Sequence, residues 1–173
     1  MTDFLTIDYL RSGTERQQAA YIELTELEIF KKLQAYKPLL AGTIPIDIAI
    51  DDSDLDIVCA CQDHKEFAGE LVKLFGKQKF FTIITKQIDG VTATIAKFEG
   101  QSFPIEIFGQ TIDSVSQNAF KHMLIEHRIL EKNGIDFRNR IIALKKTGMK
   151  TEPAFAYLLG LSGDPYKKLL EFT

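Results

Sequence analysis

The sequence predicts an α+β (α/β-like) fold, with a small mixed β-sheet, flanking helices and a C-terminal helical extension. The β-rich segments are clustered in the middle of the chain, whereas the segments on both sides have the apolar spacing of helices. A further helical segment separates the earlier strands from the later ones and is the expected crossover connection. With 173 residues, 45% of them hydrophobic, the chain is long enough to bury a substantial core.

Local signals in the sequence position the individual elements. Thr14 is a suitable N-cap for the first helix, and Pro38 ends helix formation before the first extended segment. Asp89-Gly90 is a strong hairpin signal, and Gly163-Asp164-Pro165 marks the start of the last helix. We expect strands at 38–41, 54–61, 79–86, 91–98 and 102–108, and helices at 16–27, 29–33, 64–76, 117–132 and 137–148, followed by two short helices.

The change from strands to helices divides the chain into two parts. We expect residues 1–113 to form a core with N-terminal helices, and residues 114–173 to form a helical extension that packs on it. No Pro-, Gly- or Ser-rich linker interrupts the sequence between them.

Composition narrows the class of protein. The net charge of −3 gives no overall attraction to nucleic acid or to an anionic membrane, so long nucleic acid is not an expected partner. No apolar run approaches the length of a membrane span, and the amino terminus lacks the pattern of a secretion signal. Cys59 and Cys61 have the spacing of two reduced, buried thiols in a strand. We therefore expect a soluble, cytoplasmic protein.

The most informative segment is Ser53-Asp54-Leu55-Asp56-Ile57-Val58. Residues two apart in an extended chain point to the same face, so Asp54 and Asp56 place two carboxylates side by side. Like charges this close repel each other unless one carboxylate is protonated or a cation lies between them. A divalent metal ion with oxygen ligands is the usual reason to keep such a pair.

Two other interpretations of this acidic pair are supported by fewer residues of the chain. A calcium-binding loop starting at Asp52 would have Ile57 where a glycine must make the sharp turn. The string Asp54-Leu55-Asp56-Ile57-Val58 also resembles the DxDx[TV] signature of aspartyl-phosphate phosphatases of the haloacid-dehalogenase superfamily. In that superfamily the apolar strand precedes the nucleophile, whereas here it follows the acids. The phosphatase is therefore the weaker alternative.

Three motifs together resemble the hG[GS]…Dh[DE]h…h[DE]h pattern of the polymerase-β-like nucleotidyltransferase superfamily. They are, in order, Ala41-Gly42-Thr43, Asp54-Leu55-Asp56-Ile57 and Ile105-Glu106-Ile107. The succession of helix, glycine, acidic strand, helix, hairpin and third acidic strand agrees with that fold. Segments at 42–45, 53–56, 117–123 and 150–156 look like an uncharacterised bacterial family, a domain of unknown function, within the superfamily. Thr43 departs from the usual second glycine or serine, and its branched Cβ restricts the backbone there.

The resemblance implies a magnesium-dependent nucleotidyltransferase that moves a nucleotidyl group from a nucleoside triphosphate to an unknown hydroxyl acceptor. In that scheme the catalytic carboxylates are Asp54, Asp56 and Glu106, and they hold two Mg²⁺ ions. Glu106 also lies beside the acceptor, where it can take the hydroxyl proton. Gly42 lets the main chain approach the phosphates, and the hydroxyls of Thr43 and Ser53 donate hydrogen bonds to them.

Basic residues of the C-terminal part are further candidates for contact with the nucleotide. Arg138 belongs to a basic segment that runs to Lys150 without an acid, and Arg128 lies on the preceding helix. Arginine suits bidentate phosphate contacts, so we include Arg128 and Arg138 among the candidate nucleotide-binding residues. The solvated face of a helix explains the same basic segment equally well.

A non-catalytic module of the same fold is the second candidate function. It would bind a nucleotide or a protein partner, as the antitoxin-like half of a two-protein system does. The orientation of Glu106 distinguishes the two functions. A Glu106 side chain that faces Asp54 and Asp56 favours catalysis, and one that points away favours binding alone.

Overall fold

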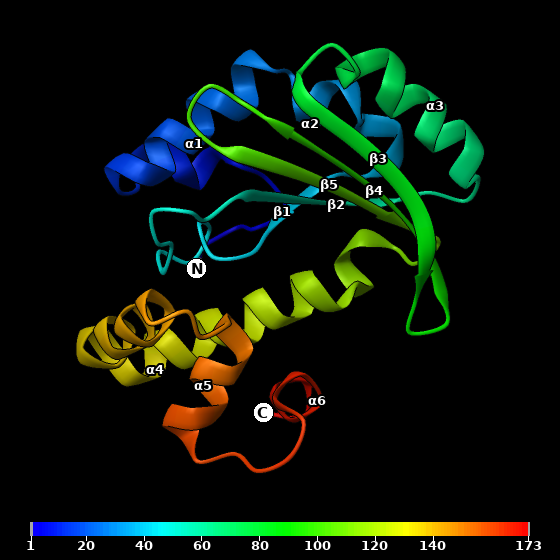
Figure 1. Cartoon of the computed structure of the whole chain (residues 1–173). Helices are drawn as coiled ribbons and strands as arrows, with labels where there is room; N and C mark the ends of the chain where they lie inside the picture. The colour runs from blue at the N-terminus through cyan, green and yellow to red at the C-terminus, as the bar shows by residue number, and fades with distance from the viewer. Residues whose placement is uncertain (1, 173) are drawn as a thin grey trace.

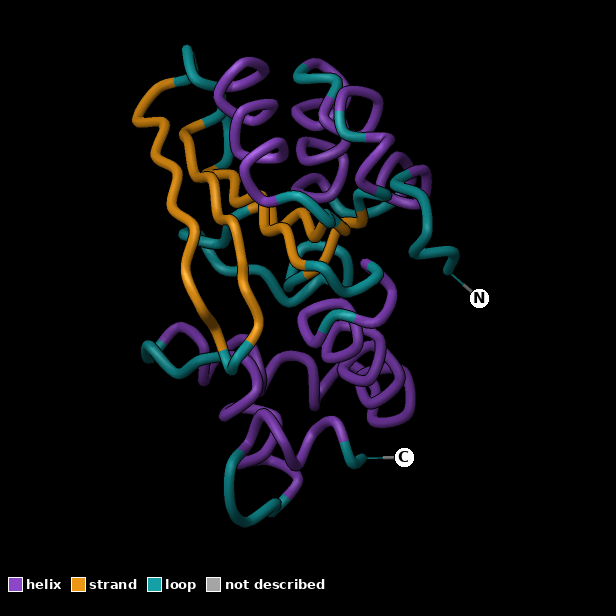
Figure 2. Tube along the Cα trace, turned by 90° about the vertical axis from the view of Figure 1, so that its right-hand side faces the viewer, coloured by secondary structure: helices purple, strands orange, loops and turns teal. Residues whose placement is uncertain are grey.

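The computed structural model describes residues 2–172 and confirms the α+β prediction. Helices α1 to α3 cover one face of a five-stranded sheet, and helices α4 to α6 lie on the other side (Figures 1 and 2). The strands are β1 (Leu39–Ala41), β2 (Leu55–Ala60), β3 (Lys79–Ile88), β4 (Val91–Glu99) and β5 (Pro104–Gln110). The helices are α1 (Glu15–Glu26), α2 (Ile29–Lys32), α3 (His64–Phe75), α4 (Asn118–Lys146), α5 (Thr151–Leu159) and α6 (Pro165–Leu170), with short 3₁₀ turns at Asp8–Ser12, Gln34–Tyr36 and Ser114–Ser116.

The strand order β1-β2-β5-β4-β3 makes the sheet mixed. Strands β2 and β5 are parallel, and the other neighbouring pairs are antiparallel. Helix α3 and the β3–β4 hairpin lie between β2 and β5 in the chain and form the crossover that parallel strands require. As a result, β2 and β5 begin at the same end of the sheet.

Most of the local signals act as the sequence predicts. Thr14 and Gln17 form a reciprocal capping box at the start of α1, and Asp164 caps α6. Asp89 and Gly90 both have positive φ (50° and 80°), as a tight hairpin turn requires. The 3₁₀ turn at Asp8–Ser12 was not predicted.

Helix α4 combines the two long helices predicted at 117–132 and 137–148. Its 29 residues are helical on both sides of Gly134, which has φ 75° and ψ −169° and kinks the helix. Because only glycine adopts this conformation easily, Gly134 explains why the sequence pattern breaks there. No helix within residues 2–172 is both long enough and apolar enough to cross a membrane.

A separate hydrophobic core lies on each face of the sheet. Ile57 faces the core under α1 and α3, whereas Val58 faces the core under α4 to α6, because alternate residues of a strand point to opposite faces. Asp56 lies on the same face as Val58 and therefore faces the C-terminal helices. Cys59 and Cys61 are buried free thiols, as predicted.

Candidate active site

The three motifs of the sequence meet at one end of the central strands. Asp56 on β2 is the register partner of Ala41 on β1, so Gly42 follows directly beside it. Asp56 is also the register partner of Glu106 on the parallel strand β5. Strand pairing thus brings the glycine motif and the two acidic strands together from positions up to 65 residues apart.

Gly42 packs against the carboxylate of Asp56. Its φ of +79° lies in the left-handed region, and a Cβ at this position would overlap Asp56 Oδ2 and lie 3.2 Å from Asp56 Cγ. The close approach of the loop to the acid therefore depends on the absence of a side chain.

The environment of Asp56 disfavours its negative charge. Burial and, to a lesser extent, the neighbouring carboxylates of Asp54 and Glu106 raise the pKa of Asp56 to about 8, against the opposing effect of Lys97. A divalent cation between the carboxylates would remove this repulsion.

Glu106 forms an ion pair with Lys97, its register partner on β4. The hydrogen bond from Lys97 to Glu106 raises the pKa of the Lys97 ammonium group. In the structure, Glu106 therefore lies across from Asp56 but is paired with a lysine.

The acidic residues fit magnesium by the chemistry of their donor atoms. Within residues 2–172, no group of three or more His, Cys, Asp or Glu side chains is spaced to hold a metal ion. Carboxylate oxygens are nevertheless the ligands that Mg²⁺ prefers, and neither Asp54 nor Asp56 forms an ion pair with a basic side chain in this part of the chain. Asp54 and Asp56 are thus available as ligands, and Glu106 would join them by exchanging Lys97 for the metal.

Thr43 and Ser53 lie next to each other at the two ends of the loop between β1 and β2. Thr43 Oγ1 donates to Ser53 Oγ at 3.4 Å, and Ser53 Oγ accepts from the Ile50 amide at 2.9 Å. Both residues line the same cavity as Gly42, Asp54 and Asp56. Their hydroxyls are therefore close to the acidic pair.

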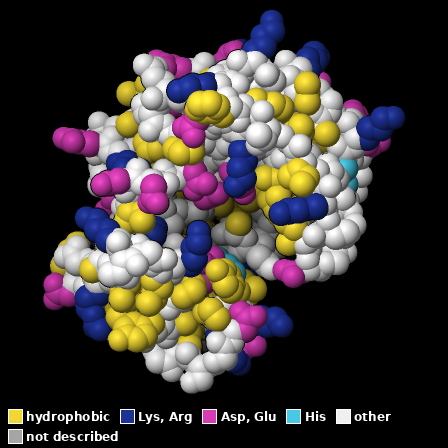
Figure 3. All heavy atoms as spheres, in the orientation of Figure 1, with side chains coloured by type: hydrophobic (Ala, Val, Ile, Leu, Met, Phe, Trp, Pro, Cys, Tyr) yellow, Lys and Arg dark blue, Asp and Glu magenta, His cyan; other side chains and the backbone are white. Residues whose placement is uncertain are grey.

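This first cavity has a volume of about 460 Å³ and lies between the β1–β2 loop and the C-terminal helices. In the space-filling view, acidic and basic side chains gather around the hollow between the two halves of the molecule (Figure 3). Its far wall carries the titratable side chains of Lys145, His122 and Glu126 from α4, Glu152 from α5, and Lys150 at the N-cap of α5. The cavity thus has carboxylates on both sides, whereas its lysines lie on the far wall only.

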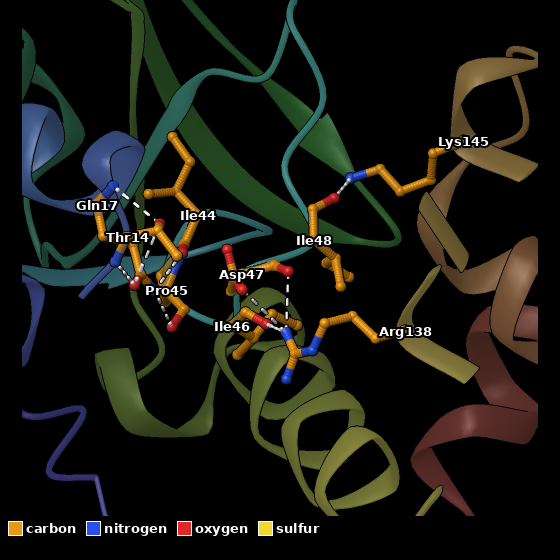
Figure 4. A network of polar contacts seen from close by, with 9 residues as sticks. All are labelled: Thr14, Gln17, Ile44, Pro45, Ile46, Asp47, Ile48, Arg138 and Lys145. Carbon is orange, nitrogen blue, oxygen red and sulfur yellow. Dashed lines mark hydrogen bonds and ion pairs between the residues drawn. The ribbon is translucent and has the colours of Figure 1, made fainter. Parts of the chain in front are cut away.

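Side chains from two helices hold the loop that forms this cavity, through five consecutive carbonyl groups at residues 44–48 (Figure 4). Gln17 Nε2 of α1 donates to the carbonyls of residues 44 and 45 at 3.0 and 3.1 Å. Arg138 Nη1 of α4 donates to those of residues 46 and 47, the latter at 2.9 Å, and Lys145 Nζ donates to residue 48 at 2.8 Å. We call Gln17, Arg138 and Lys145 the loop clamp.

The two candidate arginines lie outside the cavity lining. Arg138 uses its guanidinium group on the loop carbonyls and lies 3.8 Å from Asp47 Oδ2, so it acts on the cavity through the loop. Arg128 is exposed on α4. Gly42, Thr43, Ser53 and the two aspartates come together, whereas the arginines do not join them.

We predict that Arg138→Ala destabilises the protein by about 2 kcal/mol, because charge-assisted hydrogen bonds to two partly buried carbonyls are lost. The free energy of unfolding in urea measures this effect. Arg140→Ala, an exposed arginine on the same helix, is the matched control and should change it little. Equal effects of the two substitutions would contradict the role of Arg138 in the loop clamp.

A buried polar cluster forms the far wall of the cavity. His122 Nε2 donates to the Tyr166 carbonyl at 2.9 Å, and His122 Nδ1 lies 3.4 Å from Glu152 Oε1. Burial opposes protonation of His122, but hydrogen bonds to Glu152 and Tyr166 outweigh it and raise the pKa of the ring. Glu126 is 3% exposed, and its Oε1 has no hydrogen-bond partner. Burial raises the pKa of Glu126 to about 8.

Glu126 should make the stability of the protein depend on pH. Its pKa is higher in the folded chain than its ordinary value of 4.5, so its stabilising contribution is complete below that value and is lost as the pH rises through about 8. The wild type should lose unfolding free energy as the pH rises from about 5 to 8. We predict that Glu126→Gln makes this loss smaller by on the order of 2 kcal/mol. Urea unfolding at a series of pH values measures this, with the exposed Glu131→Gln as control. Parallel pH profiles for Glu126→Gln and the wild type would refute the prediction.

Sequence reasoning missed Glu126, Glu152 and Gln17 as residues of the site. A signal was present for Glu126, because this acid interrupts an apolar stripe of α4 that includes Met123 and Leu130. Glu152 and Gln17 carry no such signal, since their roles depend on how distant elements pack.

The architecture and the strand register define a nucleotidyltransferase fold, and comparison with solved structures agrees. The chain is similar to a structure of Cid1, described by its RNA terminal uridylyl transferase activity, with 13% identity and a TM-score of 0.58 over 84% of this chain and 48% of that chain. A Cid1 poly(U) polymerase structure with MgGTP bound has 15% identity and a TM-score of 0.54, over 88% and 49% of the two chains. The GLD-2/RNP-8 complex has 14% identity and a TM-score of 0.54, over 88% and 60%.

The chain belongs to the family described as "Domain of unknown function (DUF4269)", whose model matches residues 22–172. No protein of curated function matches it in a sequence comparison. The chain spans about half the length of the Cid1 structures, and identities this low show the fold alone.

Proposed function

We propose that the protein is a magnesium-dependent nucleotidyltransferase that transfers a nucleotidyl group from a nucleoside triphosphate to a hydroxyl acceptor. The main support is that Gly42 packs against Asp56 while Asp56 lies in register with Glu106. This arrangement brings a loop suited to phosphate binding next to carboxylates suited to magnesium. A structure with the same fold has been solved with MgGTP bound, which is consistent with the proposal.

Each residue of the site has a role in this reaction. Asp54, Asp56 and Glu106 would hold two magnesium ions, whose charge neutralises the triphosphate and favours deprotonation of the acceptor hydroxyl. The main chain at Gly42 approaches the phosphates because no Cβ intervenes, and the Ser53 hydroxyl donates to a phosphate oxygen. The Thr43 hydroxyl, which donates to Ser53 in the structure, would turn to a second phosphate oxygen.

The C-terminal helices contribute to the same cavity. Lys145 and Lys150 line it and bring positive charge to the phosphates that leave as pyrophosphate. Arg138 acts through the loop clamp, and Arg128 is exposed and does not line the cavity, so we assign it no contact. Residues 1–113 and 114–173 each supply one wall, so both parts are needed for binding.

The transfer itself requires one bond to form and one to break. The acceptor oxygen bonds to the α-phosphorus, and the bond from this phosphorus to the bridging oxygen breaks, so pyrophosphate leaves. Glu106 takes the proton of the acceptor hydroxyl and passes it to solvent.

Calorimetric titration with a non-hydrolysable nucleoside triphosphate tests the proposal. We expect binding at millimolar magnesium and a large loss of affinity in EDTA, because the phosphates would then face Asp54 and Asp56 without a cation. Binding that does not depend on a divalent ion would contradict the proposed site.

One observation favours a second candidate function, a nucleotide-binding module without catalysis. Glu106 is paired with Lys97, so the third carboxylate is neutralised by the chain itself. Glu106→Gln distinguishes the two candidates. The enzyme would lose magnesium-dependent pyrophosphate release, whereas a binding module shows none in the wild type and binds the triphosphate equally well after the substitution.

A further inference from the structure

A second cavity of about 360 Å³ lies on the other side of Asp56. It is lined by the first half of β2, by β5, by the β3–β4 turn and by the start of α4. Asp56 lines both cavities, whereas Glu106 lines only the second. If the triphosphate occupies the first cavity, as proposed above, the second one is where an acceptor hydroxyl reaches Glu106.

The residues that line the second cavity differ in charge from those that line the first. The first cavity has Lys145 and Lys150 in its wall, but no Lys, Arg or His lines the second within the described chain. Apolar side chains form much of the second wall. Its polar residues are three acids and three amides, namely Asp56, Asp89, Glu106, Gln110, Gln117 and Asn118.

Gln117 lines this cavity and has a hydrogen-bond acceptor without a partner. Its side chain is 1% exposed, and its Nε2 donates to the carbonyls of Cys59 and Ile112 at 2.8 and 3.0 Å. The Oε1 atom of the same amide is buried without a partner. A buried acceptor of this kind is costly unless a donor, from a ligand or from a water molecule, reaches it.

We propose that the second cavity binds the acceptor, and that the acceptor is a small neutral or cationic compound rich in hydroxyl or amino groups, such as a polyol, an amino alcohol or an aminosugar. Hydroxyl and amino groups donate to Gln117 Oε1 and to the carboxylates, and a ring or carbon chain covers the apolar wall. Lys97 pairs with Glu106 but lies outside the lining, so a phosphate or an RNA end would still lie against Asp56 and Asp89 without a lining cation, which costs free energy. The role of the ligand as acceptor rests on the proposed function, whereas its charge is inferred from the cavity lining alone.

Saturation-transfer NMR with three related sugars tests the proposed charge preference. The probes are glucosamine, N-acetylglucosamine and glucose 6-phosphate, which are cationic, neutral and anionic, with a short oligoadenylate as the RNA probe. We expect transfer to the first two sugars, at least about threefold weaker transfer to glucose 6-phosphate, and none to oligoadenylate. Equal or stronger transfer to the anionic probes, or none to any sugar, would overturn the inference.

Two variants assign the signal to the second cavity. Val91→Lys introduces a cation into the lining and should strengthen the glucose 6-phosphate signal relative to glucosamine. Thr92→Lys is the matched control, because Thr92 is outside the lining and its side chain points to the opposite face of β4. If both lysines have the same effect, the sugars bind elsewhere and the inference fails.

Magnesium-dependent triphosphate binding is measured in the same samples. A protein that binds the triphosphate but none of the sugars disproves the acceptor inference and leaves the proposed function intact. A protein that shows the sugar preference without triphosphate binding disproves the proposed function and leaves the charge preference intact.

Discussion

Asp56→Asn is expected to reduce magnesium-dependent pyrophosphate release on the order of 10³-fold and to leave the fold intact. The amide keeps the shape of the side chain but cannot supply a second anionic oxygen to a cation. Because burial and neighbouring acids disfavour the charge of Asp56, its neutral replacement should keep or raise the melting temperature. The assay uses the four common nucleoside triphosphates with magnesium, and thermal unfolding is followed in parallel.

Asp51→Asn is the matched control for this substitution. Asp51 is an exposed acid of the same loop that lines neither cavity. It should retain the rate of the wild type. If Asp56→Asn retains that rate as well, the acidic pair is not a metal site. If it loses activity together with its thermal transition, the effect comes from the fold.

Gly42→Ala is expected to impair both stability and triphosphate binding. Alanine at a φ of +79° costs about 1 kcal/mol, and its Cβ would in addition overlap the carboxylate of Asp56. The loop or the acid must then move, so we expect a total loss of about 3 kcal/mol in unfolding free energy. Calorimetric titration should also show at least about tenfold weaker binding of the magnesium triphosphate.

Gly160→Ala separates backbone strain from the overlap with Asp56. Gly160 ends α5 with a φ of +67°, and a Cβ there would meet no atom within 4 Å. It should therefore show the cost of the backbone conformation alone and leave nucleotide binding unchanged. If the two substitutions destabilise the protein equally and bind the triphosphate equally, the approach of Gly42 to Asp56 has no functional meaning.

The helices and strands could be predicted where residues close in the sequence determine how an element begins or turns. Thr14, Asp89-Gly90 and Asp164 act on residues near them in the chain, so the sequence predicted the elements that they begin or connect. The strand register then brought Gly42, Asp56 and Glu106 together in the order that the motifs implied.

The far wall of the site could not be predicted in the same way. Glu126, Lys145 and Glu152 reach the first cavity only because α4 and α5 fold back over the sheet, and no periodicity records that placement. The loop clamp joins α1 and α4 to carbonyl groups, which every residue has, so no sequence motif marks it. The positive charge of Arg138 made it a candidate for phosphate contact. An arginine also donates hydrogen bonds to carbonyl groups, so its charge alone does not identify which of the two it binds.

A crystal structure with magnesium and a non-hydrolysable nucleoside triphosphate tests the central claim most directly. The proposed mechanism predicts the triphosphate in the first cavity and two metal ions about 3.5 to 4 Å apart, held by Asp54, Asp56 and Glu106, with Lys97 released from Glu106. A triphosphate bound away from Gly42, or Glu106 still paired with Lys97 and no metal beside Asp54 and Asp56, would contradict it.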